Sequence, residues 1–125
     1  MKPVSVMIVD DDIAARDLLS SLLRTQFRVE IEAVSDGIEA MRMFRQKQYD
    51  IVWMDFEMPG MDGLSAIEIM RTIRSDQFIV MVSAHSDVDI VKKAIGLGVN
   101  SYIVKPFTTG KVKDAVDKYL QTRPA

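Results

Sequence analysis

The sequence predicts an α/β fold, a doubly wound five-stranded parallel sheet in the order 2-1-3-4-5 with five helices. Two observations support this prediction. Short, β-branched apolar segments alternate five times with segments of helical periodicity, and their connections are short, without internal repeats or low-complexity linkers. Such alternation is typical of a parallel sheet covered by helices on both faces. Right-handed crossovers then leave few possible topologies.

The composition limits the classes of protein to consider. The 125 residues suit one domain, and 48% hydrophobic residues can form a packed core. A net charge of −2 gives no reason to expect direct binding to nucleic acid, and the lack of cysteine excludes disulfides and Cys-based metal sites. No apolar stretch approaches the roughly 20 residues of a membrane helix, and the first residues do not resemble a signal peptide. We expect one cytoplasmic domain over residues 1–125, without membrane contact.

The first strand and helix are predicted from an abrupt change of period. Val4–Val9 is almost continuously apolar, which suits a buried parallel strand, and three aspartates follow it. From Ile13 the apolar positions repeat at helical spacing, with Asp12 as the expected N-cap. The residues expected on the inner face of this helix are Ala14, Leu18, Leu19, Leu22 and Leu23.

The second and third strand–helix units follow the same logic. In Val29–Val34 two glutamates alternate with apolar residues, which predicts an edge strand that is wet on one side. The third strand, 50–54, leads directly into Asp55. A helix is expected after Asp36-Gly37 and another over 63–74. Their inner positions are predicted to be Ile38, Met41 and Phe44 in the first, and Leu64, Ile67, Met70 and Ile73 in the second.

The last two units complete the sheet. The segment 78–82 is the most uniformly apolar strand, so we expect it to be central, and Ser101–Val104 is expected to be a short fifth strand. Gly96 or Gly98 is expected to end the fourth helix, and residues 123–125 to form a frayed tail. The predicted buried faces are Val88, Val91, Ala94 and Ile95 in the fourth helix, and Val112, Val116, Tyr119 and Leu120 in a fifth helix over 109–120.

This topology predicts a polar site at one edge of the sheet. Strands one and three are neighbours at the switch point of the order 2-1-3-4-5, so Asp10 and Asp11 should lie beside Asp55. Each pair of such carboxylates repels by about 4 kcal/mol at about 4 Å and an effective dielectric constant near 20, so the cluster needs a bound cation, a raised pKa or a lysine. Oxygen ligands favour Mg²⁺, with Mn²⁺ as a possible substitute. Ser83 and Lys105 end the fourth and fifth strands and complete a site suited to phosphoryl transfer onto Asp55.

Four segments resemble the flavodoxin-like (CheY-like) receiver domains of two-component response regulators. They are Val9-Asp10-Asp11, 55–63, 82–84 and 102–107, and the resemblance covers essentially the whole chain. It implies a signalling phosphoacceptor that catalyses only its own phosphorylation and dephosphorylation. Asp55 would take a phosphoryl group from a histidine sensor kinase or phosphotransfer protein, and this transfer would switch partner binding.

The resemblance also implies a role for each site residue. Asp11, the Asp55 side chain and the backbone carbonyl of Glu57 would bind Mg²⁺, with Asp10 acting mainly through water. Lys105 would pair with the phosphoryl oxygens, and the bond from Lys105 to Pro106 would be cis. The two residues of the switch would be Ser83, which moves to the phosphoryl group, and Tyr102, which turns inward behind it.

Two positions depart from the chemotaxis type of receiver. Glu57 replaces an asparagine two residues after the acceptor, and His85 replaces a glutamate two residues after Ser83. These positions flank the phosphoryl group in the family, so Glu57 and His85 are expected to tune the rate of its hydrolysis. The chain is therefore not expected to be a close chemotaxis orthologue by its site.

The resemblance places the partner surface on helix four, strand five and helix five, about residues 87–120. Lysines give this surface a partly basic character, namely Lys92, Lys93, Lys111, Lys113 and Lys118. A monomer or a phosphorylation-dependent dimer is expected.

Two alternative functions are considered. One is a haloacid-dehalogenase-type phosphatase, which also uses an aspartate followed two residues later by an acid, and the other is a flavodoxin-like flavin module. The three consecutive aspartates 10–12 would repel a flavin phosphate, and the chain has no room for a phosphatase cap domain.

Overall fold

The computed structural model describes residues 2–84 and 86–122, and it contains the predicted parallel sheet. The sheet order is β2-β1-β3-β4-β5, with β2 at one edge and β3 in the middle. β4, predicted to be central, lies inside the sheet between β3 and β5, and all its residues are buried. The strand bounds are β1 Val4–Val9, β2 Val29–Val34, β3 Ile51–Asp55, β4 Phe78–Ser83 and β5 Ser101–Val104. The expectations for His85 and for the tail 123–125 lie outside the described residues.

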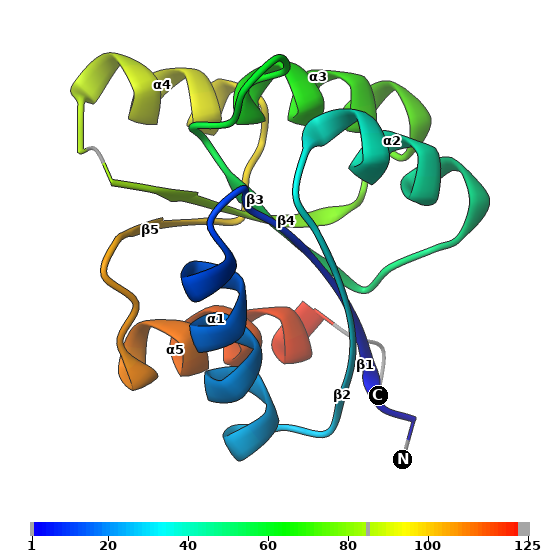
Figure 1. Cartoon of the computed structure of the whole chain (residues 1–125), viewed down its shortest axis with the longest axis vertical. Coiled ribbons are helices and arrows are strands. Elements are labelled where there is room, and N and C mark those ends of the chain that lie inside the picture. The colour runs from blue at the N-terminus through cyan, green and yellow to red at the C-terminus, as the bar shows by residue number, and fades with distance from the viewer. Residues whose placement is uncertain (1, 85, 123–125) are drawn as a thin grey trace.

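Five helices cover the two faces of the sheet. Helices α1 and α5 lie on one face, and α2, α3 and α4 lie on the other (Figure 1). Each of the first four helices begins after an aspartate whose side chain accepts a backbone N–H of the first turn; these caps are Asp12, Asp36, Asp62 and Asp87. The helix bounds are α1 Ile13–Gln26, α2 Gly37–Gln46, α3 Gly63–Ile73, α4 Val88–Gly96 and α5 Thr109–Thr122.

The sheet separates two hydrophobic cores of different composition. The core on the α1/α5 face contains Trp53, Phe78 and Phe107, and no methionine among the described residues. The core on the α2–α4 face contains or contacts all eight described methionines, from Met7 to Met81. Methionine is unbranched and flexible, so this second core adapts its packing more easily than the first.

Several apolar residues predicted to face inward are exposed. Leu18 of α1, Ile38 of α2 and Ile73 of α3 are 45%, 70% and 38% exposed, and Ala14 is exposed as well. In α4 only Ala94 is buried, whereas Val88 and Ile95 are more than half exposed. These predictions were wrong because each helix touches the sheet along a stripe narrower than its set of apolar residues. In α1, for example, Leu19 and Leu23 form the buried stripe and Leu18 lies beside it.

None of the helices among the described residues is long and apolar enough to span a membrane.

Candidate functional site

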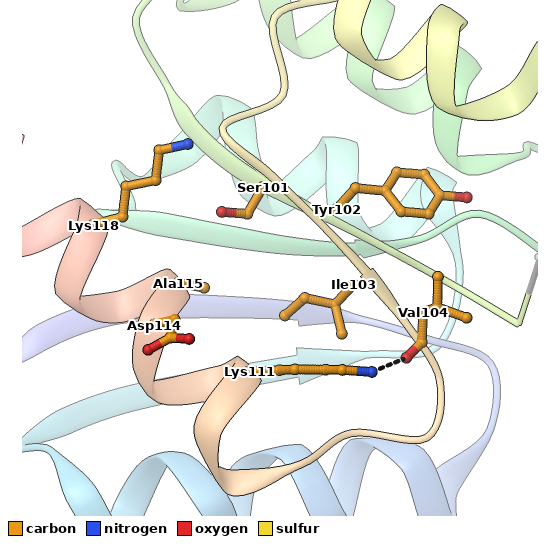
Figure 2. A pocket seen from close by; sticks show the side chains of 8 residues that line it. All are labelled: Ser101, Tyr102, Ile103, Val104, Lys111, Asp114, Ala115 and Lys118. Atoms are coloured by element: carbon orange, nitrogen blue, oxygen red, sulfur yellow. Dashed lines mark hydrogen bonds between the residues drawn. The ribbon is translucent and has the colours of Figure 1, made fainter. Parts of the chain in front are cut away.

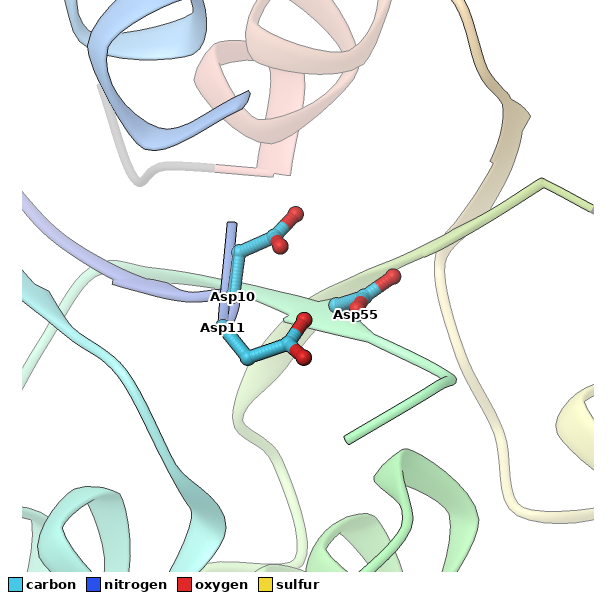
Figure 3. A group of neighbouring side chains, drawn as sticks. All are labelled: Asp10, Asp11 and Asp55. Carbon is cyan, nitrogen blue, oxygen red and sulfur yellow. The ribbon is translucent and has the colours of Figure 1, made fainter. Parts of the chain in front are cut away.

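Three carboxylates lie close together beyond the ends of β1 and β3. Asp10 and Asp11 follow β1, Asp55 is the last residue of β3, and each offers an oxygen within 4.8 Å of the other two (Figure 3). Asp10 and Asp55 are buried, whereas Asp11 is exposed. The topology therefore joins these residues as the sequence predicted. Three closely spaced carboxylate oxygens, one of them open to solvent, fit a hard divalent cation such as Mg²⁺.

Lys105 reaches this cluster from the end of β5. Its Nζ lies 2.8 Å from Oδ2 of Asp10 and 3.4 Å from Oδ1 of Asp55. The backbone N–H of Lys105 donates to the carbonyl of Ser83 at 2.8 Å, which fixes the start of the lysine side chain against β4. The Lys105–Pro106 bond is cis, as predicted. The ammonium group thus reaches from β5 across the end of β4 and contacts both buried carboxylates.

Burial and like charges change the protonation of this site. Burial raises the pKa of Asp55 to about 6, the charge of Asp10 adds to this rise, and Lys105 only partly opposes it. Burial lowers the pKa of Lys105, but its contacts with Asp10 and Asp55 outweigh burial, so this pKa lies above the usual lysine value. Asp55 therefore has an ionised carboxylate near neutral pH that still binds a proton more readily than an ordinary aspartate.

The three consecutive aspartates after β1 make different contacts. Asp12 caps α1 by accepting the N–H of Ala14 at 3.0 Å. The Oδ1 atom of Asp10 accepts the N–H of Asp12 at 2.9 Å while its Oδ2 atom pairs with Lys105, so both of its oxygens are occupied. Arg16 donates to the backbone carbonyl of Asp10 at 2.7 Å, a contact that the sequence analysis missed. Asp11 is left as the exposed carboxylate beside Asp55.

Gly63 holds the loop between β3 and α3 close to the backbone of Asp55. The N–H of Gly63 donates to the carbonyl of Phe56 at 2.9 Å. A Cβ atom on Gly63 would lie only 2.3 Å from the backbone oxygen of Asp55, so glycine permits the close approach of α3. The sequence indicated only a turn here. Glu57 is exposed on this loop and, with Asp11, lines an open cavity of about 390 Å³.

The two predicted switch residues lie on neighbouring strands. Ser83, at the end of β4, is completely buried. Tyr102, on β5, is partly buried and packs against the methionine-containing core, so its ring lies on the opposite side of β5 from α5 (Figure 2). Ser83 is therefore close along the sheet to both Asp55 and Lys105, because Val82 pairs with Asp55 and Ser83 pairs with Val104.

A comparison with models of protein families identifies the family of this chain. The model of the response regulator receiver domain matches residues 6–117. The chain belongs to this family. As a receiver domain it is a phosphorelay protein of two-component signalling, and receiver domains generally bind Mg²⁺ at an aspartate cluster. The haloacid-dehalogenase-type phosphatase and the flavin module considered from the sequence are not favoured.

Individual relatives agree with this assignment. The receiver domain is 33% identical to the chemotaxis protein CheY-3 of Vibrio cholerae, over 96% of this chain and 94% of that protein. It is 29% identical to sporulation initiation phosphotransferase F of Bacillus subtilis, over 92% of each. A putative response regulator from Chloroflexus aurantiacus is similar in structure, with a TM-score of 0.89 at 27% identity, covering 96% of this chain and 99% of that one.

Proposed function

We propose that Asp55 is the phosphoacceptor of a single receiver domain spanning residues 1–125, and that its phosphorylation switches the binding of a protein partner. The observation that carries this proposal is the convergence of Asp10, Asp11, Asp55 and Lys105 at one edge of the sheet. Asp10 is also buried and contacts Lys105, but its other oxygen already accepts the N–H of Asp12, whereas Asp55 is the last residue of β3 and lies 3.4 Å from Lys105. The donor would be the phosphohistidine of a sensor kinase or of a phosphotransfer protein.

The reaction is a displacement at phosphorus. A carboxylate oxygen of Asp55 forms a bond to phosphorus while the bond from phosphorus to the donor's imidazole nitrogen breaks. Asp11, Asp55 and the backbone carbonyl of Glu57 would hold Mg²⁺, with Asp10 acting through water, and the ion would supply positive charge against the phosphoryl oxygens. Lys105 turns from Asp55 toward the transferred group and supplies the second positive charge. The burial of Asp55 limits the access of bulk water to the resulting acyl phosphate.

The phosphoryl group would be recognised by Ser83 and Tyr102. The Ser83 hydroxyl would donate to a phosphoryl oxygen, and Tyr102 would move inward behind it, changing the surface formed by α4, β5 and α5. A cavity of about 410 Å³ lies on this surface between β5 and α5, and Lys111 and Lys118 line it (Figure 2). We infer a protein partner here, not nucleic acid or membrane, for a cytoplasmic monomer or a dimer formed on phosphorylation.

Two residues would adjust the lifetime of the phosphorylated state. Glu57 is exposed beside Asp11, where its side chain can reach the cation, Lys105 or the hydrolytic water. His85, two residues after Ser83 in the sequence, would act in the same way. Replacement of Glu57 by Asn should change the rate of autodephosphorylation; equal rates for the two proteins would remove Glu57 from the mechanism.

The test of the proposed function is phosphorylation in the absence of a kinase. Wild-type protein is incubated with Mg²⁺ and a small phosphodonor such as acetyl phosphate, and phosphate incorporation is followed by intact mass. Incorporation into the wild type, its absence from Asp55→Asn, and its persistence in Asp17→Asn are expected, because Asp17 is an exposed carboxylate on α1. Phosphate incorporation into Asp55→Asn at the wild-type level would refute the assignment.

A further inference from the structure

The carboxyl-terminal end of α4 is held by one side chain of α3. Arg71 donates from Nε to the carbonyl of Leu97 at 2.9 Å and from Nη2 to the carbonyl of Gly98 at 2.7 Å. Its Nη1 donates to the carbonyls of Gln77, at 2.6 Å, and Ser75, at 3.3 Å. The last carbonyls of a helix lack partners within the helix and carry partial negative charge, so a guanidinium is well suited to bind them.

The turn that Arg71 holds has its own specific geometry. Gly98 has a φ of +76°, the left-handed conformation that commonly ends a helix. The N–H groups of Leu97, Gly98 and Val99 all donate back into the last turn of α4, to carbonyls between Lys93 and Ile95. Arg71 therefore binds the outer side of a closed, fully hydrogen-bonded turn at the edge of the sheet opposite Asp55.

The rest of α4 is held much less firmly. Ala94, near the carboxyl-terminal end, is the one buried residue of this helix, and Val88 at its start is 64% exposed. The amino-terminal end follows Ser83 after a short connection and is capped locally by Asp87, which accepts the N–H of Asp89 at 2.8 Å. The core beneath α2, α3 and α4 is the methionine-containing one, which can repack with little loss of contact.

We propose that Arg71 fixes the carboxyl-terminal end of α4 to α3, so that activation displaces the amino-terminal end of α4 about this fixed point. This inference rests on the proposed phosphorylation of Asp55 as the activating event. A rearrangement at Ser83 then moves the end of α4 nearest the site, and Arg71 limits how far the displacement spreads along the helix. Loss of Arg71 would turn a movement of one end into a loosening of the whole helix.

Arg74, the C-cap residue of α3, offers a matched control. It lies three residues after Arg71, and it donates to the carbonyl of Phe44 at 2.7 Å with its guanidinium 4.2 Å from the centre of the Phe44 ring. It therefore holds the end of α2, not of α4. Arg74→Gln removes an arginine from the C-cap of α3 and leaves the contacts of Arg71 to Leu97 and Gly98 in place.

The experiment is hydrogen exchange of the full chain, free and with Mg²⁺ and beryllofluoride as a phosphoryl mimic. In the free protein, Arg71→Gln should speed exchange at Leu97, Gly98 and Val99 by about tenfold, because the hydrogen bonds that hold the turn are lost. Arg74→Gln should leave these amides at the wild-type rate. In the wild type, the mimic should change exchange near Val91 and leave the turn at Leu97–Val99 unchanged, whereas in Arg71→Gln the change should extend into that turn.

Two results would overturn the inference: wild-type exchange at Leu97–Val99 in free Arg71→Gln, or an equal response of both ends of wild-type α4 to the mimic. Should Arg71→Gln not fold, Arg71→Lys keeps the charge but reaches fewer carbonyls, and faster exchange of the turn is expected there too. If mass measurement shows that the wild type binds no beryllofluoride, the proposed function fails, and the comparison of free proteins still decides whether Arg71 anchors α4.

Discussion

At the scale of single residues, the buried carboxylate of Asp55 should make stability depend on pH. The pKa of Asp55 is raised from its usual 3.8 to about 6, so the folded state binds this proton more tightly than the unfolded chain. Its contribution to stability is therefore greatest below about pH 4 and is lost as the pH rises through 6. The shift of roughly two pKa units corresponds to at most about 3 kcal/mol.

Asp55→Asn removes the free-energy cost of burying a charged carboxylate at this position. Without Mg²⁺, the variant should be more stable than the wild type by about 1–3 kcal/mol at pH 8, and the difference should shrink toward pH 4.5. Urea unfolding in a chelator at both pH values measures this, with Asp17→Asn as the exposed control. A gain for Asp55→Asn that is the same at both pH values would show that the burial of the charge is not its cause.

Lys105 competes with the cation for the same carboxylates. Its Nζ contacts both Asp10 and Asp55, so Lys105→Met removes a positive charge from the site and frees two ligands. We expect Mg²⁺ to bind severalfold more tightly, because like charges then no longer repel, and phosphorylation by acetyl phosphate to slow at least tenfold. Fluorescence of Trp53, buried two residues before Asp55, can follow the titration. Lys113→Met, on exposed α5, should alter neither quantity; weaker Mg²⁺ binding by Lys105→Met would contradict the prediction.

The sequence predicted the positions of the short carboxylates better than the contacts of the long arginine side chains. Asp10, Asp11 and Asp55 were placed correctly because a strand end fixes where a short side chain can be. Arg16 and Arg71 were not identified, because a long side chain can bind a carbonyl several residues away in sequence or on another helix. Nothing in the spacing of residues along α1 or α3 indicates which carbonyl that is.

At the scale of elements, the start of α3 depends on Gly63. Gly63→Ala would place a methyl group 2.3 Å from the oxygen of Asp55 and 2.9 Å from the Cα of Phe56, so the helix and the acceptor loop must separate. We expect a loss of about 1–3 kcal/mol or more, with weakened Mg²⁺ binding. Gly96→Ala in α4 is the control, because no atom lies within 4 Å of its added Cβ. It should be neutral or stabilise by up to about 1 kcal/mol. Equal unfolding midpoints in urea for the two variants would contradict this account.

The start of α1 followed from its predicted cap, but the inner faces of the helices did not follow from their periodicity. Asp12, the expected N-cap, gave the first residue of α1 correctly. The inner face of α2 was predicted to include Ile38, which is 70% exposed because it stands on the first turn, at the rim of the layer. Periodicity gives the direction of an apolar stripe, whereas the width that is covered depends on the neighbouring element.

At the scale of the whole molecule, the strand order brought the site together before any side chain was placed. The order 2-1-3-4-5 makes β1 and β3 neighbours, and this pairing alone places the two acidic loops side by side. The unequal distribution of methionine between the two cores was not predicted. This distribution depends on which residue occupies each single position, and no local rule requires it. On β3, for example, the neighbouring residues Trp53 and Met54 lie in different cores.

The stability of the whole fold should respond to Mg²⁺ through Asp11. A cation that binds only the folded state stabilises it by about 2.7 kcal/mol at a concentration 100 times its dissociation constant. Asp11 is exposed and makes no ion pair with Lys105 among the described contacts, so Asp11→Asn should fold normally and unfold at the wild-type urea concentration in a chelator. Added Mg²⁺ should then raise the unfolding midpoint of the wild type and leave that of Asp11→Asn nearly unchanged. Asp17→Asn, altered at another exposed carboxylate one turn into α1, should respond like the wild type. An equal Mg²⁺ response from Asp11→Asn would place the cation elsewhere on the molecule.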